Sequence, residues 1–347
     1  MTSKKFAGGV FGALALSIAL ISGGAVGTAG ASAPNGVAPT GVDTWIVPQT
    51  QQSGDYWTAE RMRAAIPGDA LVADKAAAAA AKGVQSRPST SGSAVTVPSQ
   101  AVTVPSQAAT VPGPVDTVTP NATTPNATTP NATQESTVSH IGKVFFTLSG
   151  SDYVCSGNAV SSANQSTVAT AGHCVNEGPG NFASRWIFVP AYENGSAPYG
   201  QWTASKLTTP SQWGTDGNIS YDTGFATVAS LNGATLSSTV GASGVSFNQS
   251  RGLTYNAFGY PAAAPFNGAT LQSCSGTATD DPYGQSESQG IPCDMTGGSS
   301  GGPWFIGTGS AGSQNSINSF GYNNVPNTMF GPYWGSVIQN AYASASA

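Results

Sequence analysis

Short β-type runs separated by Gly, Asn and Pro fill the chain from Val138 to its end. Each run holds β-branched, aromatic or aliphatic residues over four to six positions, the pattern of a strand bounded by turns. Many such strands favour an all-β barrel or sandwich, and about 210 residues are enough for one two-lobed β domain with a substantial core. Within this region only Gly335–Ala345 has a helical pattern. The runs are Lys143–Leu148, Ser166–Thr170, Trp186–Val189, Thr223–Val228 and Leu253–Phe258.

The beginning of the chain has the pattern of a secretory signal peptide. Two lysines precede the apolar run Phe6–Ile21, and small residues follow it. Cleavage after Ala31 is preferred to cleavage after Ala33, because the second would leave Pro34 at the first mature position. The apolar run is too short to span a membrane, and no later segment is long enough. We therefore expect a secreted, extracellular protein that loses residues 1–31 and has no membrane association afterwards.

Two kinds of segment lie between the signal and the β-type region. Residues 55–82 are Ala-rich with mixed charge, which predicts a helix beginning near Thr58, with Glu60 in its first turn and an interruption at Pro67-Gly68. Residues 94–137 contain near-repeats in which proline recurs regularly, so we expect an extended, solvated linker without helix or sheet ladder. Three Asn-Ala-Thr triplets are formal glycosylation acceptors that we interpret as spacer sequence without glycan, at Asn121, Asn126 and Asn131.

Four cysteines in an exported chain predict two disulfides, because oxidising compartments favour them. Three pairings are possible. Cys155 with Cys174 and Cys274 with Cys293 close the shortest loops, 19 residues apart in each case, and are the simplest choice. Two histidines and no Cys-x-x-Cys make a zinc site a poor interpretation, so no metal and no cofactor is expected.

Charged residues make up only 8% of the chain, and Ser, Thr, Gly and Asn supply the polarity instead. From Val138 onward there are four Lys/Arg against nine Asp/Glu, a net charge of −5. Such a surface repels phosphate backbones, so we expect no nucleic-acid partner.

The stretch Met295–Trp304 contains four glycines and two adjacent serines, with almost no side chain that fills a core. This density of glycine predicts a tight loop with exposed N–H groups, which can hold an anion. Acyl transfer needs such a loop, because two backbone donors stabilise the developing oxyanion beside a nucleophilic hydroxyl. Ser300 is the candidate nucleophile. A flexible Gly/Ser turn is the alternative, and a partner base decides between them.

The candidate base is His173, one of only two histidines in the chain. It follows a β-type run directly and precedes Cys174, so a disulfide to Cys155 would fix the backbone beside the imidazole. The other histidine, His140, lies at the expected start of the domain, where a surface or terminal role is the simpler interpretation.

The third group should be a buried carboxylate that accepts from the imidazole N–H. Asp222 is the preferred candidate, because it opens an apolar strand where an acidic residue is costly unless it is paired. Asp216 lies in a Gly-Thr-Asp-Gly turn composition, and Asp280-Asp281-Pro282 has the composition of an exposed loop. The competing acids are Asp216, Asp280, Asp281 and Asp294.

Thr170–Cys174, Tyr221-Asp222 and Gly298–Pro303, in the order His, Asp, Ser, resemble the chymotrypsin-like serine peptidases. The order excludes α/β-hydrolases and subtilisins, whose triads run differently. The resemblance covers about 60% of the chain. It implies an all-β fold of two six-stranded antiparallel β-barrels with a C-terminal helix, preceded by a largely disordered pro/linker region. The stretches that are similar to the glutamyl-endopeptidase branch are Val189-Pro190, Pro198–Gly200, Gly259–Pro261 and Met295–Pro303.

The resemblance also implies the division of the chain. The segment Trp57–Arg63 is similar to part of a pro-region. The implied boundaries are a signal peptide at 1–31, a pro-region at 32–93, a linker at 94–137 and the peptidase domain at 138–347.

The roles implied by the resemblance are those of a serine endopeptidase acting on protein or peptide substrates, as a monomer. Ser300 attacks the peptide carbonyl, His173 takes and returns the proton, and Asp222 orients and compensates the imidazole. The N–H groups of Gly298 and Ser300 form the oxyanion hole. Substrate is bound by the strand Ser319, Phe320 and Gly321, and by a pocket wall that includes Gly331.

Two departures from the family pattern bear on activation and specificity. Ser299 stands where digestive members have an aspartate, and Ser139–Lys143 stands where they have Ile-Val-Gly-Gly, so activation by an inserted N-terminal ammonium is disfavoured. Asp294 lies six residues before Ser300, where trypsin-like members keep an acid that favours Lys or Arg; an exposed position beside Cys293 is the equal alternative. Glutamate specificity is disfavoured, because Asn318-Ser319 replaces the usual histidine.

Three rival functions follow from the same residues. The first rival is an inactive family member that binds a ligand through the cleft. The second is an esterase on the same fold, and the third is a wall-spanning stalk that displays a β domain. The intact set of Ser300, His173, Asp222 and Gly298 argues against the inactive member, and labelling with an active-site serine phosphonylating reagent separates the peptidase from a stalk or a dead enzyme.

Overall fold

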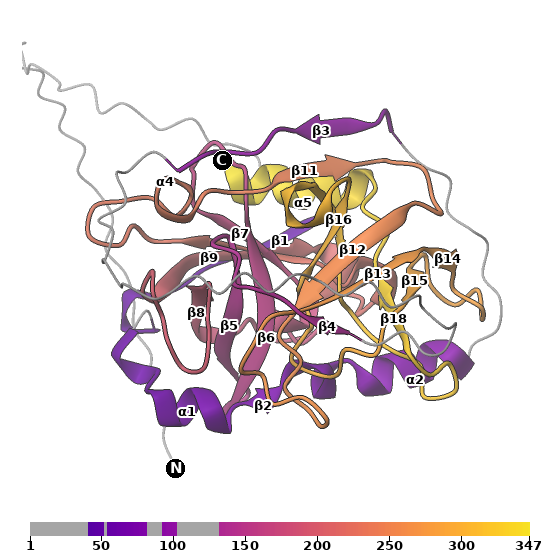
Figure 1. Cartoon of the computed structure of the whole chain (residues 1–347), viewed down its shortest axis with the longest axis horizontal. Coiled ribbons are helices and arrows are strands. Elements are labelled where there is room, and N and C mark those ends of the chain that lie inside the picture. The colour runs from indigo at the N-terminus through magenta and orange to yellow at the C-terminus, as the bar shows by residue number, and fades with distance from the viewer. Residues whose placement is uncertain (1–40, 52–53, 82–91, 103–131) are drawn as a thin grey trace, which may run out of the picture. The chain divides into compact units, whose positions relative to one another are not determined.

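The computed structural model describes residues 41–51, 54–81, 92–102 and 132–347 (Figure 1). By their contacts, Ala38–Ala347 form one unit; the other unit, Met1–Val37, contains the expected signal peptide and lies outside the described residues. The three Asn-Ala-Thr acceptor asparagines also lie outside them. Within the described ranges, no helix is long and apolar enough to cross a membrane.

Six antiparallel strands close into a barrel, in the order β5-β6-β7-β10-β9-β8 with β8 paired back to β5. Successive residues of β5 point to opposite faces, so Val144 and Phe146 enter the barrel core while Phe145 packs in a second cluster outside it. The first predicted barrel is confirmed. Its strands are β5 (Ile141–Leu148), β6 (Ser151–Val160), β7 (Thr167–Thr170), β8 (Ser184–Pro190), β9 (Trp202–Pro210) and β10 (Gly224–Val228).

The C-terminal half differs from the predicted second barrel. Its strands pair as a seven-stranded sheet, β3-β11-β17-β16-β12-β13-β4, and a three-stranded sheet, β14-β15-β18, and neither path closes. The disulfide Cys274–Cys293 connects β13 to the residue that follows β15, so it joins the two sheets. The strands are β11 (Gly244–Phe247), β12 (Thr254–Gly259), β13 (Gln272–Thr277), β14 (Thr279–Asp280), β15 (Gln289–Pro292), β16 (Pro303–Ile306), β17 (Ser313–Ile317) and β18 (Thr328–Gly331).

The predicted C-terminal helix is α5 (Ser336–Ser346). Its buried residues Ile338, Ala341, Tyr342 and Ala345 follow the i, i+3, i+4, i+7 spacing of one helix face, and all four pack into the core shared with the barrel. The remaining helical segments are short: α3 (Ser211–Gly214), α4 (Leu236–Val240), and the 3-10 turns η4 (Gly172–Cys174), η5 (Ile219–Tyr221) and η6 (Gly309–Ala311).

The described residues before Val138 are more ordered than predicted. The expected helix is confirmed as α1, capped by the Thr58 side chain, with Glu60 in its first turn and an end before Pro67. We call residues 41–81, as far as they are described, the upstream segment. Its elements are β1 (Val42–Ile46), η1 (Gln49–Gln51), η2 (Gly54–Tyr56), α1 (Ala59–Ala64), β2 (Ile66–Pro67), η3 (Gly68–Leu71) and α2 (Ala73–Ala81).

The prediction that the linker forms no sheet ladder is wrong at both of its described ends. The strand β3 (Val95–Val97) pairs with β11, and β4 (Thr133–Gln134) pairs with β13. Both lie at the edges of the seven-stranded sheet, where only one side of a strand needs hydrogen-bond partners. Pro98 follows β3 and does not interrupt it, because the three residues before it are free of proline.

Candidate active site

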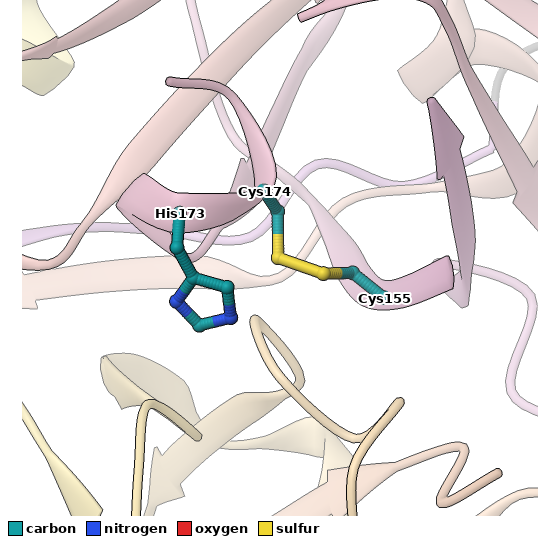
Figure 2. A group of neighbouring side chains, drawn as sticks. All are labelled: Cys155, His173 and Cys174. Atoms are coloured by element: carbon teal, nitrogen blue, oxygen red, sulfur yellow. A yellow bond between two sulfur atoms is a disulfide. The ribbon is translucent and has the colours of Figure 1, made fainter. Parts of the chain in front are cut away.

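The turn that carries His173 is held to the barrel by a disulfide. Residues Gly172–Cys174 form η4 directly after β7, and Cys174 is bonded to Cys155 on β6. Figure 2 shows the imidazole projecting from this turn beside the disulfide. Both predicted pairings, Cys155–Cys174 and Cys274–Cys293, are confirmed. The sulfurs near His173 are therefore not thiolates, and this Cys-His group is not a set of metal ligands.

His173 and Asp222 form a fully buried pair. His173 Nδ1 lies 2.8 Å from Asp222 Oδ2, and the His173 backbone N–H donates to Asp222 Oδ1 at 2.8 Å. Because the carboxylate only accepts, Nδ1 carries the hydrogen and Nε2 keeps its lone pair. Gly172 is required by this close approach, since an added Cβ would lie 2.8 Å from Asp222 Oδ1.

A third donor completes the carboxylate's surroundings. Ser319 Oγ donates to Asp222 Oδ2 at 2.5 Å. The two carboxylate oxygens thus accept three hydrogen bonds in a site with no exposed surface, which is how a buried charge is tolerated. The sequence predicts Ser319 only as part of a substrate-binding strand, because no local pattern shows the direction of its hydroxyl.

His173 Nε2 is the unpaired atom of the site. It is buried, and within the described residues it has no hydrogen-bond partner. The turn of Ser300 packs against the turn of His173. The Ser300 carbonyl accepts from Ser156 N at 2.7 Å and lies 3.9 Å from Cys174 Sγ, and a Cβ at Gly301 would lie 2.7 Å from Ala171 N. The structure therefore brings the three predicted residues of the triad to one place.

The turn before Ser300 leaves two N–H groups free. Gly298 has φ +95°, a conformation that favours glycine, and in the described part of the chain neither Gly298 N nor Ser300 N donates to a protein acceptor. Ser156 Oγ positions this turn, because it donates to Gly298 O at 2.9 Å and accepts from Tyr260 N at 2.9 Å. The turn has the geometry of an anion-binding site.

Asn318 supports the same turn from the other side. Its side chain donates to Ser299 O at 3.0 Å and to Phe258 O at 2.9 Å, and it accepts from Trp304 Nε1 at 2.7 Å. Neither Ser156 nor Asn318 was predicted as a site residue. Their contacts connect segments that are far apart in the sequence, so no local pattern points to them.

A cavity of about 310 Å³ lies beside Ser300. Of the predicted substrate-binding residues, Asp294, Ser319, Phe320 and Gly321 line it. Gly331 is not among the described residues that line it, since the backbone there lies close to Ile317 and Ser316, and its place in the pocket wall stays a prediction. The carboxylate of Asp294 is half-buried and accepts from Ala132 N at 2.5 Å, so it contacts both the pocket and the backbone near residue 132.

The other candidate residues have separate structural roles. Asp280 pairs with Arg251 at 2.9 Å, and Asp281 accepts from Tyr322 OH at 2.8 Å. His140 is partly buried, with Nδ1 2.7 Å from Asn158 Oδ1, and burial lowers its pKa. Within the described residues, the hydrogen bonds of His140 and Asp281 do not involve His173 or Asp222.

Comparisons with known proteins agree with this geometry. No protein-family model matches the chain, and no curated protein matches it. Among solved structures, protease Anisep from Arthrobacter nicotinovorans is 64% identical over 61% of this chain and 98% of that chain, with a TM-score of 0.61. A thermostable serine protease, AL20, from an extremophilic microorganism is 55% identical over 60% of this chain and 97% of that chain, with a TM-score of 0.58.

The chain belongs to the chymotrypsin-like serine peptidases. A structure of Glu endopeptidase also matches, with 18% identity over 64% of this chain and 99% of that chain and a TM-score of 0.48. Nearly the whole of the Anisep and AL20 chains corresponds to about three fifths of this one, so these two solved chains hold almost no counterpart of the remaining residues.

Proposed function

We propose that this serine peptidase is a secreted endopeptidase that hydrolyses peptide bonds through an acyl-enzyme on Ser300. The observation that carries the proposal is the buried His173 imidazole, fixed at Nδ1 by Asp222 and unpaired at Nε2, packed beside the turn of Ser300. An unpaired, correctly protonated imidazole beside a serine is the arrangement that general-base catalysis needs.

In the proposed reaction, Ser300 Oγ attacks the peptide carbonyl carbon while His173 Nε2 takes its proton. The carbonyl oxygen becomes negative and is stabilised by the N–H groups of Gly298 and Ser300. Collapse of the tetrahedral intermediate breaks the C–N bond, and the proton moves from Nε2 to the leaving amine. Water then attacks the acyl carbonyl carbon while His173 Nε2 takes its proton, and collapse of the second tetrahedral intermediate breaks the ester bond and returns the proton to Ser300 Oγ. Loss of one oxyanion donor costs about 2.7–4 kcal/mol in comparable enzymes.

The substrate-binding proposal concerns the cavity beside Ser300. The Asp294 carboxylate on its wall supports a preference for Lys or Arg before the scissile bond, whereas the hydrogen bond from Ala132 N supports a structural role for the same group. Replacement of Asp294 by Ser separates the two. Loss of Lys/Arg cleavage with an unchanged melting temperature supports the pocket role, and loss of stability with an unchanged cleavage profile supports the structural one.

An active-site phosphonylating reagent tests the function directly, with Ser300→Ala as the variant and Ser299→Ala as the matched control. Ser299 Oγ donates to Thr296 O at 2.8 Å, so the neighbouring hydroxyl is already engaged. We expect Ser299→Ala to retain labelling and peptide hydrolysis and Ser300→Ala to lose both. An inactive binding protein or a displayed stalk domain would stay unlabelled in every form, and an esterase would be labelled and cleave esters but not peptides.

A further inference from the structure

We propose that the upstream segment is a built-in inhibitor that covers the peptidase cleft, with Gly68 and Asp69 across the catalytic residues, and that activity requires its displacement. The inference rests on the proposed function, because it assigns regulation to the same site. It identifies an interaction surface, the cleft around Ser300 and His173, and its partner, residues 54–81 of this chain.

Gly68 crosses the catalytic residues at close range. It is buried, and a Cβ added there would lie 2.5 Å from Cys155 Sγ, 3.2 Å from Val154 O and 3.8 Å from His173 Cδ2. The segment therefore lies against the disulfide and the edge of the imidazole with no room for a side chain. A substrate backbone needs the same space in order to reach Ser300.

Asp69 follows and lies against the turn that precedes Ser300. A Cβ added at Gly297 would overlap the Asp69 carboxylate. Burial raises the pKa of Asp69, and the nearby His173 imidazole acts against that rise. The segment thus places the Asp69 carboxyl group against the turn that precedes Ser300, in space that a bound substrate would need.

Val72 and Ala76 fill the adjoining aromatic surface. They are 1% and 3% exposed and pack in one cluster with Phe320, Tyr322 and Trp213. Together with Asp69 and Ala73 they form a wall of the cavity beside Ser300. The aromatic residues belong to the peptidase region, so removal of the segment would expose their apolar surface at the cleft.

The other end of the segment is anchored on the barrel. Trp57 is 2% exposed, donates from Nε1 to Arg185 O at 2.5 Å and packs on Phe145 with ring centroids 5.5 Å apart. Tyr56 OH donates to Asp152 at 2.9 Å. Between the anchor and Gly68, β2 extends the barrel sheet by pairing in parallel with β6 at Tyr153 and Val154. The segment is therefore fixed on both sides of the catalytic residues.

The test uses the chain without residues 1–31 and with a recognition site for an unrelated protease inserted between residues 103 and 131. Phosphonylation of Ser300 is timed in three samples: the uncut chain, the cut chain, and the peptidase part after the released segment has been separated. Val72→Asp places a charge in the aromatic cluster and weakens the segment's contact. Ile46→Asp is the matched control, since Ile46 lies in β1 with 67% of its surface exposed.

We expect the uncut chain and Ile46→Asp to be labelled at least about tenfold more slowly than the separated peptidase part, and Val72→Asp to recover most of that rate. A synthetic peptide of residues 41–81 should slow labelling of the separated part again, which keeps the test independent of how the variant folds. Equal labelling rates before and after separation, or no effect of the peptide, would overturn the inference. Absence of labelling in every sample would instead contradict Ser300 as the nucleophile.

Discussion

Replacement of Asp222 by asparagine exchanges one carboxylate oxygen for an NH₂ group with almost no change in shape. In the native protein Oδ1 accepts from the His173 backbone N–H at 2.8 Å, and Oδ2 faces His173 Nδ1 at 2.8 Å and Ser319 Oγ at 2.5 Å. Asparagine has a single acceptor oxygen. The backbone N–H cannot turn away, whereas imidazole can change its tautomer. The amide oxygen therefore takes the Oδ1 place, and the NH₂ group takes the Oδ2 place.

This exchange changes the tautomer of His173, the proposed catalytic base. An NH₂ group that donates to Nδ1 forces the hydrogen of the imidazole onto Nε2, the atom proposed to accept the proton of Ser300. We expect kcat to fall about 10⁴-fold with KM nearly unchanged, a loss of about 5.5 kcal/mol in transition-state stabilisation. Folding should change far less, because two of the three hydrogen bonds of the site can still form.

The assay is peptide hydrolysis by the separated peptidase part, with Ser319→Ala as the matched control. Ser319→Ala removes one hydrogen bond from the same carboxylate but leaves the tautomer of His173 intact, so we expect a loss between about tenfold and a hundredfold. An Asp222→Asn enzyme that keeps more than a tenth of the native kcat, or that loses no more than Ser319→Ala, would refute the assigned tautomer and role.

Three further predictions follow. Removal of the Cys155–Cys174 bridge by serine substitution should lower the free energy of unfolding by about 2–4 kcal/mol in denaturant titrations. It should also reduce hydrolysis, because the turn of His173 loses its covalent link to β6. An unchanged denaturation midpoint would contradict this prediction. Gly298→Ala should abolish hydrolysis while the protein still folds, because the residue has φ +95° and the new Cβ would lie 2.7 Å from the Cβ of Ala262. Hydrolysis at the native rate would show that Gly298 is not part of the oxyanion hole. Burial lowers the pKa of Lys143 to about 8, so between pH 8 and 10.5 the unfolded chain binds a proton that the folded chain lacks. The free energy of unfolding should therefore rise with pH by up to about 3 kcal/mol over that window. Lys143→Met should abolish this rise, and a variant with the same pH profile as the native protein would refute the prediction.

The local patterns of the sequence were sufficient for several strands, for the C-terminal helix and for the three candidate triad residues. Turn signals delimit runs such as Lys143–Leu148, which became β5, and the helical pattern of Gly335–Ala345 became α5. His173 and Ser300 were recognisable because a disulfide-linked turn and a glycine-rich turn each have a short, local composition. Asp222 was inferred from the cost of burying an unpaired acid.

Contacts between distant segments were not predictable in the same way. Strand pairing depends on partners far along the chain, so the open sheets of the C-terminal half and the pairing of Val95–Val97 with β11 could not be read from local pattern. The hydrogen bond of the Ser319 hydroxyl depends on side-chain direction within the folded protein. Asp69 has no local signal at all, because its importance arises only where the upstream segment meets the cleft.

The central claim is that His173 activates Ser300 to form an acyl-enzyme. A slowly deacylating ester, added to the separated peptidase part and followed by peptide mapping with mass spectrometry, tests it most directly. We expect one acyl group on Ser300 in the native enzyme and none in His173→Ala. An acyl group on Ser299 or another residue, or acylation of Ser300 that proceeds equally fast without the imidazole, would contradict it.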